Sequence, residues 1–250
     1  MYAISAETCD VGIKRVPLND DFSLDVDGIC ATENVNLVFI CAPNNPTGTQ
    51  VSKADLTAVL EHFADTALVV VDEAYIEFDI KSTWATQLAA YPNLVVLRTL
   101  SKAFALAGLR CGFTIASEAI IQSLLKVIAP YPIPEPVAQI VAQALTAGNI
   151  ERMQQQVAFL NEQRTRLQAE LATRPGVELV GDVKANYILF RHSHCAQIMQ
   201  YLVSQGMLIR DQSKQLNLQN CLRVTIGSAE QNQRLLSLLD AYFEQAGASL

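Results

Sequence analysis

The sequence predicts an α/β domain built on a mainly parallel sheet, followed by a small C-terminal α+β domain. In the first part, short apolar runs such as 37–42 and 67–71 alternate with helical segments, which is typical of parallel sheets covered on both faces. Four prolines within 130–136 interrupt this pattern, because proline cannot continue a helix. The residues that follow predict helices and strands in a less regular order. We place the boundary near residue 150, which gives domains 1–150 and 151–250.

Local patterns predict the individual elements. Ser52 can cap a helix over 53–63, and Asp55 suits the positive end of that helix. The strands of the first part are expected at 37–41, 67–71, 94–99 and 112–116, with a short helix at 83–90. The later helices are expected at 118–127, 136–147, 149–174, 196–205 and 228–245. The later strands are expected at 177–180, 187–191, 207–211 and 221–225.

Composition excludes several classes of protein. Half of the 250 residues are hydrophobic and 17% are charged, so a disordered chain is not expected. The net charge of −7 disfavours nucleic-acid binding, and no apolar run approaches the ~18–20 residues that cross a bilayer. The first residues carry no basic and apolar pattern of a secretory signal. The six cysteines form no CxxC pair and predict reduced thiols of a cytoplasmic protein.

Polar residues end three of the predicted strands. They occupy 44–48 (NNPTG), 72–75 (DEAY) and 99–102 (TLSK), and Arg110 follows eight residues later. Ligands of open parallel sheets bind beyond the carboxyl ends of the strands. Pyridoxal 5′-phosphate needs a lysine for its aldehyde, a carboxylate for its ring nitrogen, donors for its ring oxygen, and hydroxyls with a guanidinium for its phosphate. These three segments and Arg110 supply each of those groups.

Longer strings in the chain resemble a known family. NNPTG (44–48), VVDEAYIEF (70–78) and TLSKAFALAGLRCGF (99–113) are similar to motifs of the fold-type I, pyridoxal-phosphate-dependent aminotransferases of class II. They resemble the histidinol-phosphate aminotransferase branch, as do IAPYPIPEPV (128–137), NYILF (186–190), LIRDQSK (208–214) and LRVTIG (222–227). The resemblance covers nearly the whole chain. It implies the large domain of the fold-type I transferases over 1–150 and their small domain over 151–250.

The resemblance implies a role for each matching residue that would contact the cofactor. Lys102 would bond to the cofactor through its amine and would later move a proton at the substrate carbon. Asp72 would pair with the ring nitrogen. Tyr75 and Asn45 would bind the ring oxygen, and Asn45–Pro46 is a candidate for a cis peptide bond. The remaining residues would bind the phosphate, namely Thr99, Ser101 and Arg110.

Two further arginines are implied to bind the substrate. Arg223 would bind its anionic end, with Arg210 as a second cation. These arginines would meet the phosphate of histidinol phosphate in one half-reaction. In the other they would meet a carboxylate of glutamate or 2-oxoglutarate.

Structural interpretations stand beside these roles. An isolated lysine is usually a surface residue, and segment 44–48 is rich in turn-forming residues. Asp72–Glu73 is either a strand-end pair facing solvent or part of a binding site, and the apolar strand before it favours the second. Arg223 lies in an apolar strand, so either a structural carboxylate or a ligand is expected to pair with it.

Arg210 and one histidine-rich run are ambiguous on sequence alone. Arg210 is either the second cation or part of a surface ion pair with Asp211. The run His192–Cys195 (HSHC) contains two histidines and a cysteine, which can bind zinc, but a fourth ligand at suitable spacing is missing. A solvated loop is therefore expected there.

The family normally has a substantial segment before the residue that matches Met1. That segment carries a strand of the large sheet, a phosphate-binding turn, an aromatic that stacks on the cofactor ring, and an arm that reaches the partner subunit. Tyr2 is near the place of the stacking aromatic without occupying it. We therefore expect the sheet of an N-terminally truncated chain to have an exposed apolar edge and weakened cofactor binding.

The resemblance implies a transaminase of histidine biosynthesis that acts on histidinol phosphate and 2-oxoglutarate as a cytoplasmic homodimer. Two alternatives remain. One is an aminotransferase for aromatic or other amino acids, or a decarboxylase of the same fold. The other is an inactive fragment that acts only by association with other chains.

Overall fold

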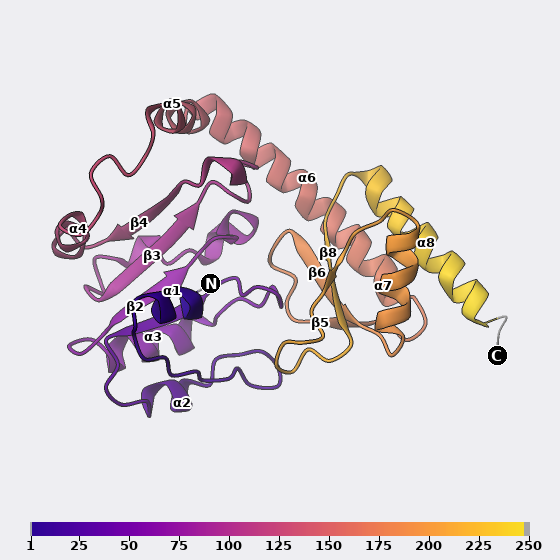
Figure 1. The fold of residues 1–250 in the computed structure, drawn as a ribbon, viewed down its shortest axis with the longest axis horizontal. Helices are drawn as coiled ribbons and strands as arrows, with labels where there is room; N and C mark the ends of the chain where they lie inside the picture. Colours follow the sequence, from indigo (N-terminus) through magenta and orange to yellow (C-terminus); the bar gives the residue numbers. More distant parts are fainter. Residues whose placement is uncertain (1, 248–250) are drawn as a thin grey trace. The chain divides into compact units, whose positions relative to one another are not determined.

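The computed structural model describes residues 2–247, which divide into two compact units (Figure 1). The first unit comprises Met1–Pro43, Gln50–Ile76 and Lys81–Gln143. The second comprises Asn44–Thr49, Glu77–Ile80 and Ala144–Leu250. The assignment of 1–150 and 151–250 to functional domains stays a prediction. Among the described residues, no helix is both long enough and apolar enough to cross a membrane.

The first unit is built on a four-stranded, mainly parallel sheet, as predicted. Its strands are β1 (Leu37–Cys41), β2 (Leu68–Asp72), β3 (Leu94–Thr99) and β4 (Gly112–Ala116), in that order. The first three are parallel and β4 is antiparallel to β3. The chain between β3 and β4 holds only the 3₁₀ turn η3 (Ala107–Leu109), too short for the crossover that a parallel pair needs.

Helices of the first unit follow the expected pattern only in part. Ser52 caps α3 (Lys53–His62) by accepting a bond from the Asp55 amide, as predicted. The helix predicted at 83–90 is wrong, because only the 3₁₀ turn η2 (Ala85–Gln87) forms there. The others are α1 (Tyr2–Thr8), α2 (Val26–Cys30), α4 (Glu118–Leu125) and α5 (Glu135–Ala144). The 3₁₀ segment η1 (Ile76–Ser82) has residues in both units.

The two faces of this sheet differ in what they contact. Ile40, Val71 and Val96 lie on one face and pack with α3 and Trp84 into a buried core. Because side chains alternate along a strand, Phe39, Asp72 and Thr99 project from the other face. β1 is an edge strand of this sheet, and its Leu37 and Phe39 side chains are 50% and 43% exposed. An exposed apolar edge is therefore present in the described structure.

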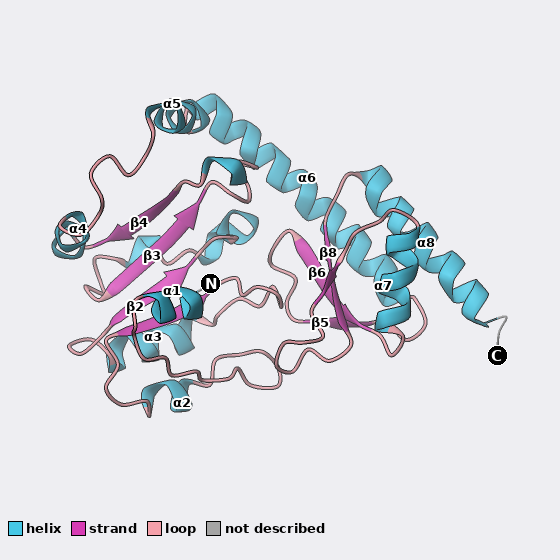
Figure 2. Ribbon diagram, viewed as in Figure 1, coloured by secondary structure: helices cyan, strands magenta, loops and turns pink. Residues whose placement is uncertain are grey.

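The second unit is an antiparallel sheet with three helices (Figure 2). Its sheet order is β5 (Glu178–Val180), β6 (Tyr187–Arg191), β8 (Cys221–Thr225), β7 (Arg210–Asp211). The strand predicted at 207–211 is shorter than expected, because the Met207 amide donates to Leu202 and closes the preceding helix. The helices are α6 (Ala147–Ala172), α7 (Cys195–Ser204) and α8 (Ala229–Gly247).

Packing of the second unit buries apolar residues on both faces of its sheet, since Leu189 and Phe190 are 1% and 0% exposed. Phe190 and Leu222 form a buried core with residues of α6, α7 and α8. Arg223 follows Leu222 and therefore projects from the opposite face, as does its cross-strand neighbour Leu189.

Candidate functional site

The Asp72 carboxylate lies at the carboxyl end of β2 and is bonded on both oxygens. Its Oδ1 accepts from the Ala74 amide at 2.9 Å, and the Tyr2 hydroxyl donates to Oδ2. Burial first, and the Asp72 charge second, raise the pKa of the neighbouring Cys41 thiol to about 12. Burial and Asp72 also raise the pKa of Tyr2.

The contact of Tyr2 with Asp72 was not predicted. Tyr2 lies on α1, and its ring stacks on Phe39 with 4.4 Å between ring centroids. Because Phe39 and Asp72 share one face of the sheet, the stacking directs the hydroxyl toward the carboxylate. A pairing across seventy residues has no local sequence pattern from which it could be found.

Lys102 and Tyr75 lie in the chain segments that follow β3 and β2, respectively, and their side chains contact each other. The Lys102 Nζ lies 5.1 Å from the centroid of the Tyr75 ring, in the range of a cation–π contact. The Tyr75 side chain is buried and that of Lys102 is half-buried. The Lys102 amine is therefore positioned by the ring of Tyr75, which follows Asp72 by three residues in the chain.

Hydroxyl groups cluster at the carboxyl end of β3. The Thr99 hydroxyl donates to Ser101 Oγ at 2.8 Å, and the Ser101 amide donates to Thr99 Oγ1 at 3.1 Å. Together with Asp72, Tyr75 and Lys102, these residues form what we call the strand-end cluster. Arg110 ends η3 in the left-handed region (φ 53°), is exposed, and donates to the Ala107 carbonyl at 3.2 Å.

Glu73 neither faces solvent nor is available to a ligand, which corrects the interpretation of Asp72–Glu73 as one binding pair. Its side chain is fully buried and forms an ion pair with Arg98 at 2.9 Å. Sequence reasoning missed Arg98. An arginine inside the apolar run of β3 is the signal that could have found it, since a buried guanidinium requires a partner.

The second unit brings two arginines together. Arg210 and Arg223 are direct cross-strand partners in β7 and β8, so their side chains project from the same face. The Arg223 guanidinium lies 4.8 Å from the centroid of the Tyr187 ring, and Nη1 donates to Asn45 Oδ1. Its Nε is buried and has no hydrogen-bond partner among the described residues. We call Arg210 and Arg223 the arginine pair.

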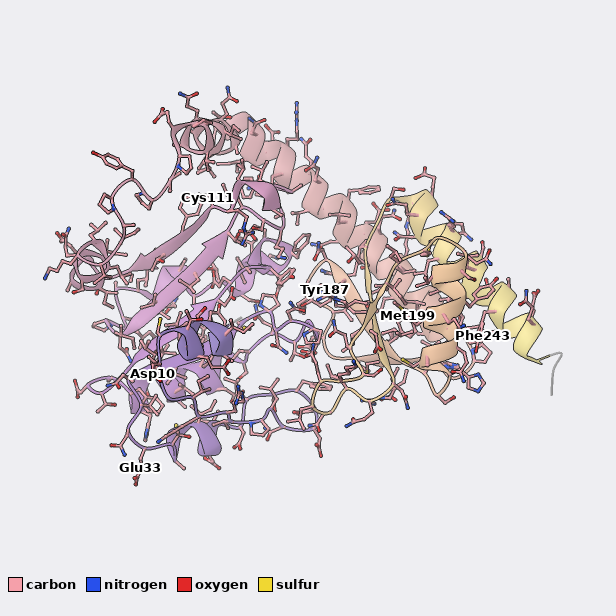
Figure 3. The ribbon with its side chains drawn as sticks, viewed as in Figure 1. Asp10, Glu33, Cys111, Tyr187, Met199 and Phe243 are labelled. Atoms are coloured by element: carbon pink, nitrogen blue, oxygen red, sulfur yellow. The ribbon has the colours of Figure 1, made fainter. Side chains whose placement is uncertain are left out.

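The loop 44–49 packs against the same region of the second unit. The Tyr187 hydroxyl, on the β6 residue labelled in Figure 3, donates to the Asn44 carbonyl at 2.6 Å. The Gly48 amide donates to the same carbonyl and closes a turn, and Asn45–Pro46 is cis, as expected. Gly181 (φ +77°) allows the approach of this loop, because a Cβ there would lie 2.0 Å from the Thr47 carbonyl oxygen.

No carboxylate pairs with the arginine pair among the described residues. Asp211, the alternative partner of Arg210, accepts instead from the Ser213 amide at 2.8 Å. Ser213 first and Lys214 second lower the pKa of Asp211. Like charges directly opposite each other destabilise a sheet, so the arginine pair is suited to an anion.

The solvated loop expected at 192–195 is wrong for His192 and Cys195, which are both buried. His192 Nδ1 accepts from the His194 amide at 2.9 Å, and Nε2 lies 3.2 Å from the Pro175 carbonyl. Both ring nitrogens are thus engaged in joining the turns before β5 and α7. Ser193 and His194 are exposed, as expected.

Comparisons with known proteins agree with this fold. The model of the family "Aminotransferase class I and II" matches residues 1–239, and the chain belongs to this pyridoxal-phosphate-dependent family. The histidinol-phosphate aminotransferase of Pseudoalteromonas atlantica is 64% identical over 97% of the chain. The chain spans 66% of that relative, or about two thirds of its length.

Two solved structures show the same fold. One is the histidinol-phosphate aminotransferase of Clostridium acetobutylicum, with a TM-score of 0.89, 24% identity, and coverage of 98% of this chain and 75% of that one. The other is the Sinorhizobium meliloti enzyme of the same name in complex with pyridoxal 5′-phosphate. It has a TM-score of 0.83, 23% identity, and coverage of 96% and 68%.

Proposed function

We propose that the chain provides the reactive lysine and the main binding groups of a transaminase in histidine biosynthesis. The reaction exchanges the amino group between L-histidinol phosphate and 2-oxoglutarate, with imidazole acetol phosphate and glutamate as the other pair. The observation that carries the proposal is the strand-end cluster, in which an acid, a phenol, two hydroxyls and an amine follow two neighbouring strands. The names of the relatives support the choice of substrate.

The donor set of the first unit fits pyridoxal 5′-phosphate. Asp72 already accepts two hydrogen bonds and would give its carboxylate to the ring nitrogen, while Tyr75 would donate to the ring oxygen. Thr99 and Ser101 would donate their hydroxyls to the phosphate, and Arg110 would add a guanidinium. Asn45 would be a further donor to the ring oxygen. When bound, the cofactor supplies an electron sink for charge that develops at the substrate carbon.

Lys102 would have two tasks in succession. Its amine would first bond to the cofactor and would be released when the amino donor takes its place. The freed amine would then remove the proton from the substrate carbon and return it one position away. The Tyr75 ring beside the Lys102 Nζ would orient the amine for both tasks.

The arginine pair would bind the anionic end of each substrate. A phosphate or carboxylate between Arg210 and Arg223 would neutralise their repulsion and could accept from the buried Arg223 Nε. Because the arginine pair is suited to an anion, we rank transamination of aromatic amino acids and decarboxylation below transamination of histidinol phosphate. A chain that acts only by association would leave the strand-end cluster without a function.

The proposal includes a setting for the enzyme. We infer a cytoplasmic homodimer that acts on small molecules and binds neither nucleic acid nor membranes. The net charge of −7 supports the absence of nucleic-acid binding, and the six free cysteines support the cytoplasm.

Borohydride reduction after addition of pyridoxal 5′-phosphate tests the proposal. Peptide mass spectrometry should find the reduced cofactor on Lys102, and Lys102→Ala should lose both the label and the visible absorbance. Lys126→Ala, a change of an exposed lysine beyond α4, is the matched control and should keep both. Label on other lysines alone, or identical spectra for wild type and Lys102→Ala, would contradict the proposal. Conversion of histidinol phosphate, compared with phenylalanine, then identifies the amino donor.

A further inference from the structure

A buried network lies beside the strand-end cluster without being part of it. The Glu73 carboxylate is fully buried and receives the Arg98 Nε at 3.0 Å and Nη2 at 2.9 Å. The Trp84 amide donates to Glu73 Oε1 at 2.5 Å, and the Thr83 hydroxyl lies 2.9 Å from Oε2. Arg98 Nη2 also donates to Thr83 Oγ1 at 2.7 Å. Three side chains therefore form a closed ring of charge-assisted hydrogen bonds.

The network is placed to control the distance between two parts of the strand-end cluster. Glu73 directly follows Asp72, and Arg98 directly precedes Thr99. β2 and β3 pair in register, with Asp72 opposite Leu97, and the Glu73 amide extends the ladder to the Leu97 carbonyl. Asp72 and Thr99 thus project from one face of two adjacent strands, and the network joins those strands on the other.

We propose that Glu73 and Arg98 are positioning residues that fix the spacing between the Asp72 carboxylate and the Thr99–Ser101 hydroxyls. This inference rests on the proposed function, in which one cofactor contacts both groups at once. A ligand that bridges two groups binds best when their spacing is set in advance, because it then pays no ordering cost. A ligand that contacts one group only gains little from the spacing.

The affinity ratio of two cofactor forms separates positioning from a general structural role. Pyridoxal 5′-phosphate contacts both groups, whereas pyridoxal lacks the phosphate. In Glu73→Gln, which keeps the size of the side chain and removes its charge, we expect the ratio of Kd for pyridoxal to Kd for pyridoxal 5′-phosphate to fall about tenfold. A loss of stability alone would weaken both ligands equally and leave the ratio unchanged.

A second variant and an internal reporter keep the test decisive if Glu73→Gln unfolds. Arg98→Lys keeps the positive charge but loses the forked donors, so the ratio should fall here too. Trp84 is the only tryptophan, so its emission reports whether the network has opened, independently of cofactor. Glu178→Gln removes the carboxylate of the more exposed pair with Arg191 and should leave the ratio as in wild type.

The outcomes distinguish this inference from the proposed function. A wild-type chain that binds neither cofactor form, measured by calorimetry, overturns both. Wild-type binding with an unchanged ratio in Glu73→Gln and Arg98→Lys overturns the positioning role alone. The positioning role is supported if the Kd ratio falls in folded Glu73→Gln or Arg98→Lys and the Trp84 emission changes, while Glu178→Gln keeps the wild-type ratio.

Discussion

The strand-end cluster and the arginine pair differ in how their polar groups are satisfied. In the first unit, Asp72 accepts two hydrogen bonds, and Thr99 and Ser101 bond to each other. In the second unit, two guanidinium groups oppose each other across a strand pair, and one buried Nε has no partner among the described residues. The polar groups of the first arrangement bond to each other, whereas the second is expected to need an anion.

The difference matches the lifetimes of the ligands that we propose for the two regions. A resident cofactor replaces existing bonds once, so its donors and acceptors can be satisfied beforehand. A substrate that enters and leaves at every turnover is bound strongly where charges lack a partner, since its arrival then relieves repulsion. The predictions below test this comparison.

The largest effect is expected in the strand-end cluster. Asp72→Asn removes the charge predicted to pair with the ring nitrogen, and kcat should fall about 10²–10³-fold. The change also removes the negative neighbour of Cys41, so the pKa of that thiol should decrease while burial still keeps it above its ordinary value. Steady-state kinetics and thiol alkylation as a function of pH measure the two effects. Full activity of Asp72→Asn would remove the acid from the proposed site.

An intermediate effect is expected in the arginine pair. Arg223→Gln should raise KM for histidinol phosphate roughly 10–100-fold, because a charge-assisted bond to the anion is lost. The exposed Arg210→Gln should raise it only about 2–5-fold, as for solvent-exposed ion pairs. The exposed Arg166→Gln on α6 is the control and should leave KM unchanged. Equal effects of Arg223→Gln and Arg210→Gln would contradict the difference in burial.

The smallest effect is expected at His192, which belongs to neither region. Burial lowers the pKa of this histidine below its ordinary value, so the unfolded chain binds the proton more readily than the folded one. The stabilisation is complete above the ordinary pKa of ~6.5 and is lost as pH falls toward the folded value. Denaturant unfolding should show this slope in wild type, and His192→Gln should reduce it. If His192→Gln leaves the slope of the unfolding free energy against pH unchanged, this pH dependence arises from other groups.

Sequence patterns predicted local features of the fold better than distant contacts. The bounds of β1, β3, β4, β6 and β8 are confirmed because each is a short segment of mainly apolar residues next to turn-forming residues. The short helices α1 and α2 were missed, since neither contains a fully buried residue that would give it an apolar period. The antiparallel direction of β4 depends on how residues 100–111 fold, since they form only the 3₁₀ turn η3, and the patterns of the two strands do not contain that information.

The candidate site shows the same limit. The positions of Asp72, Thr99 and Lys102 follow from the ends of strands, so they could be named without coordinates. Two further features depend on pairings between distant segments, namely the contact of Tyr2 with Asp72 and the opposition of Arg210 and Arg223. The partner of Glu73 was within reach, because an arginine in an apolar strand predicts a buried carboxylate nearby.

The way the chain passes between its two units limits how the protein can be dissected. It crosses from one to the other five times, at residues 43–44, 49–50, 76–77, 80–81 and 143–144. A fragment that begins at residue 144 would therefore lack the loop 44–49, which contacts Gly181 and Tyr187. Neither half is expected to fold as an autonomous module, because ten residues of the second unit (44–49 and 77–80) come before residue 143. Recombining homologous halves at a single junction would therefore require these ten residues to fit the second unit of the other protein.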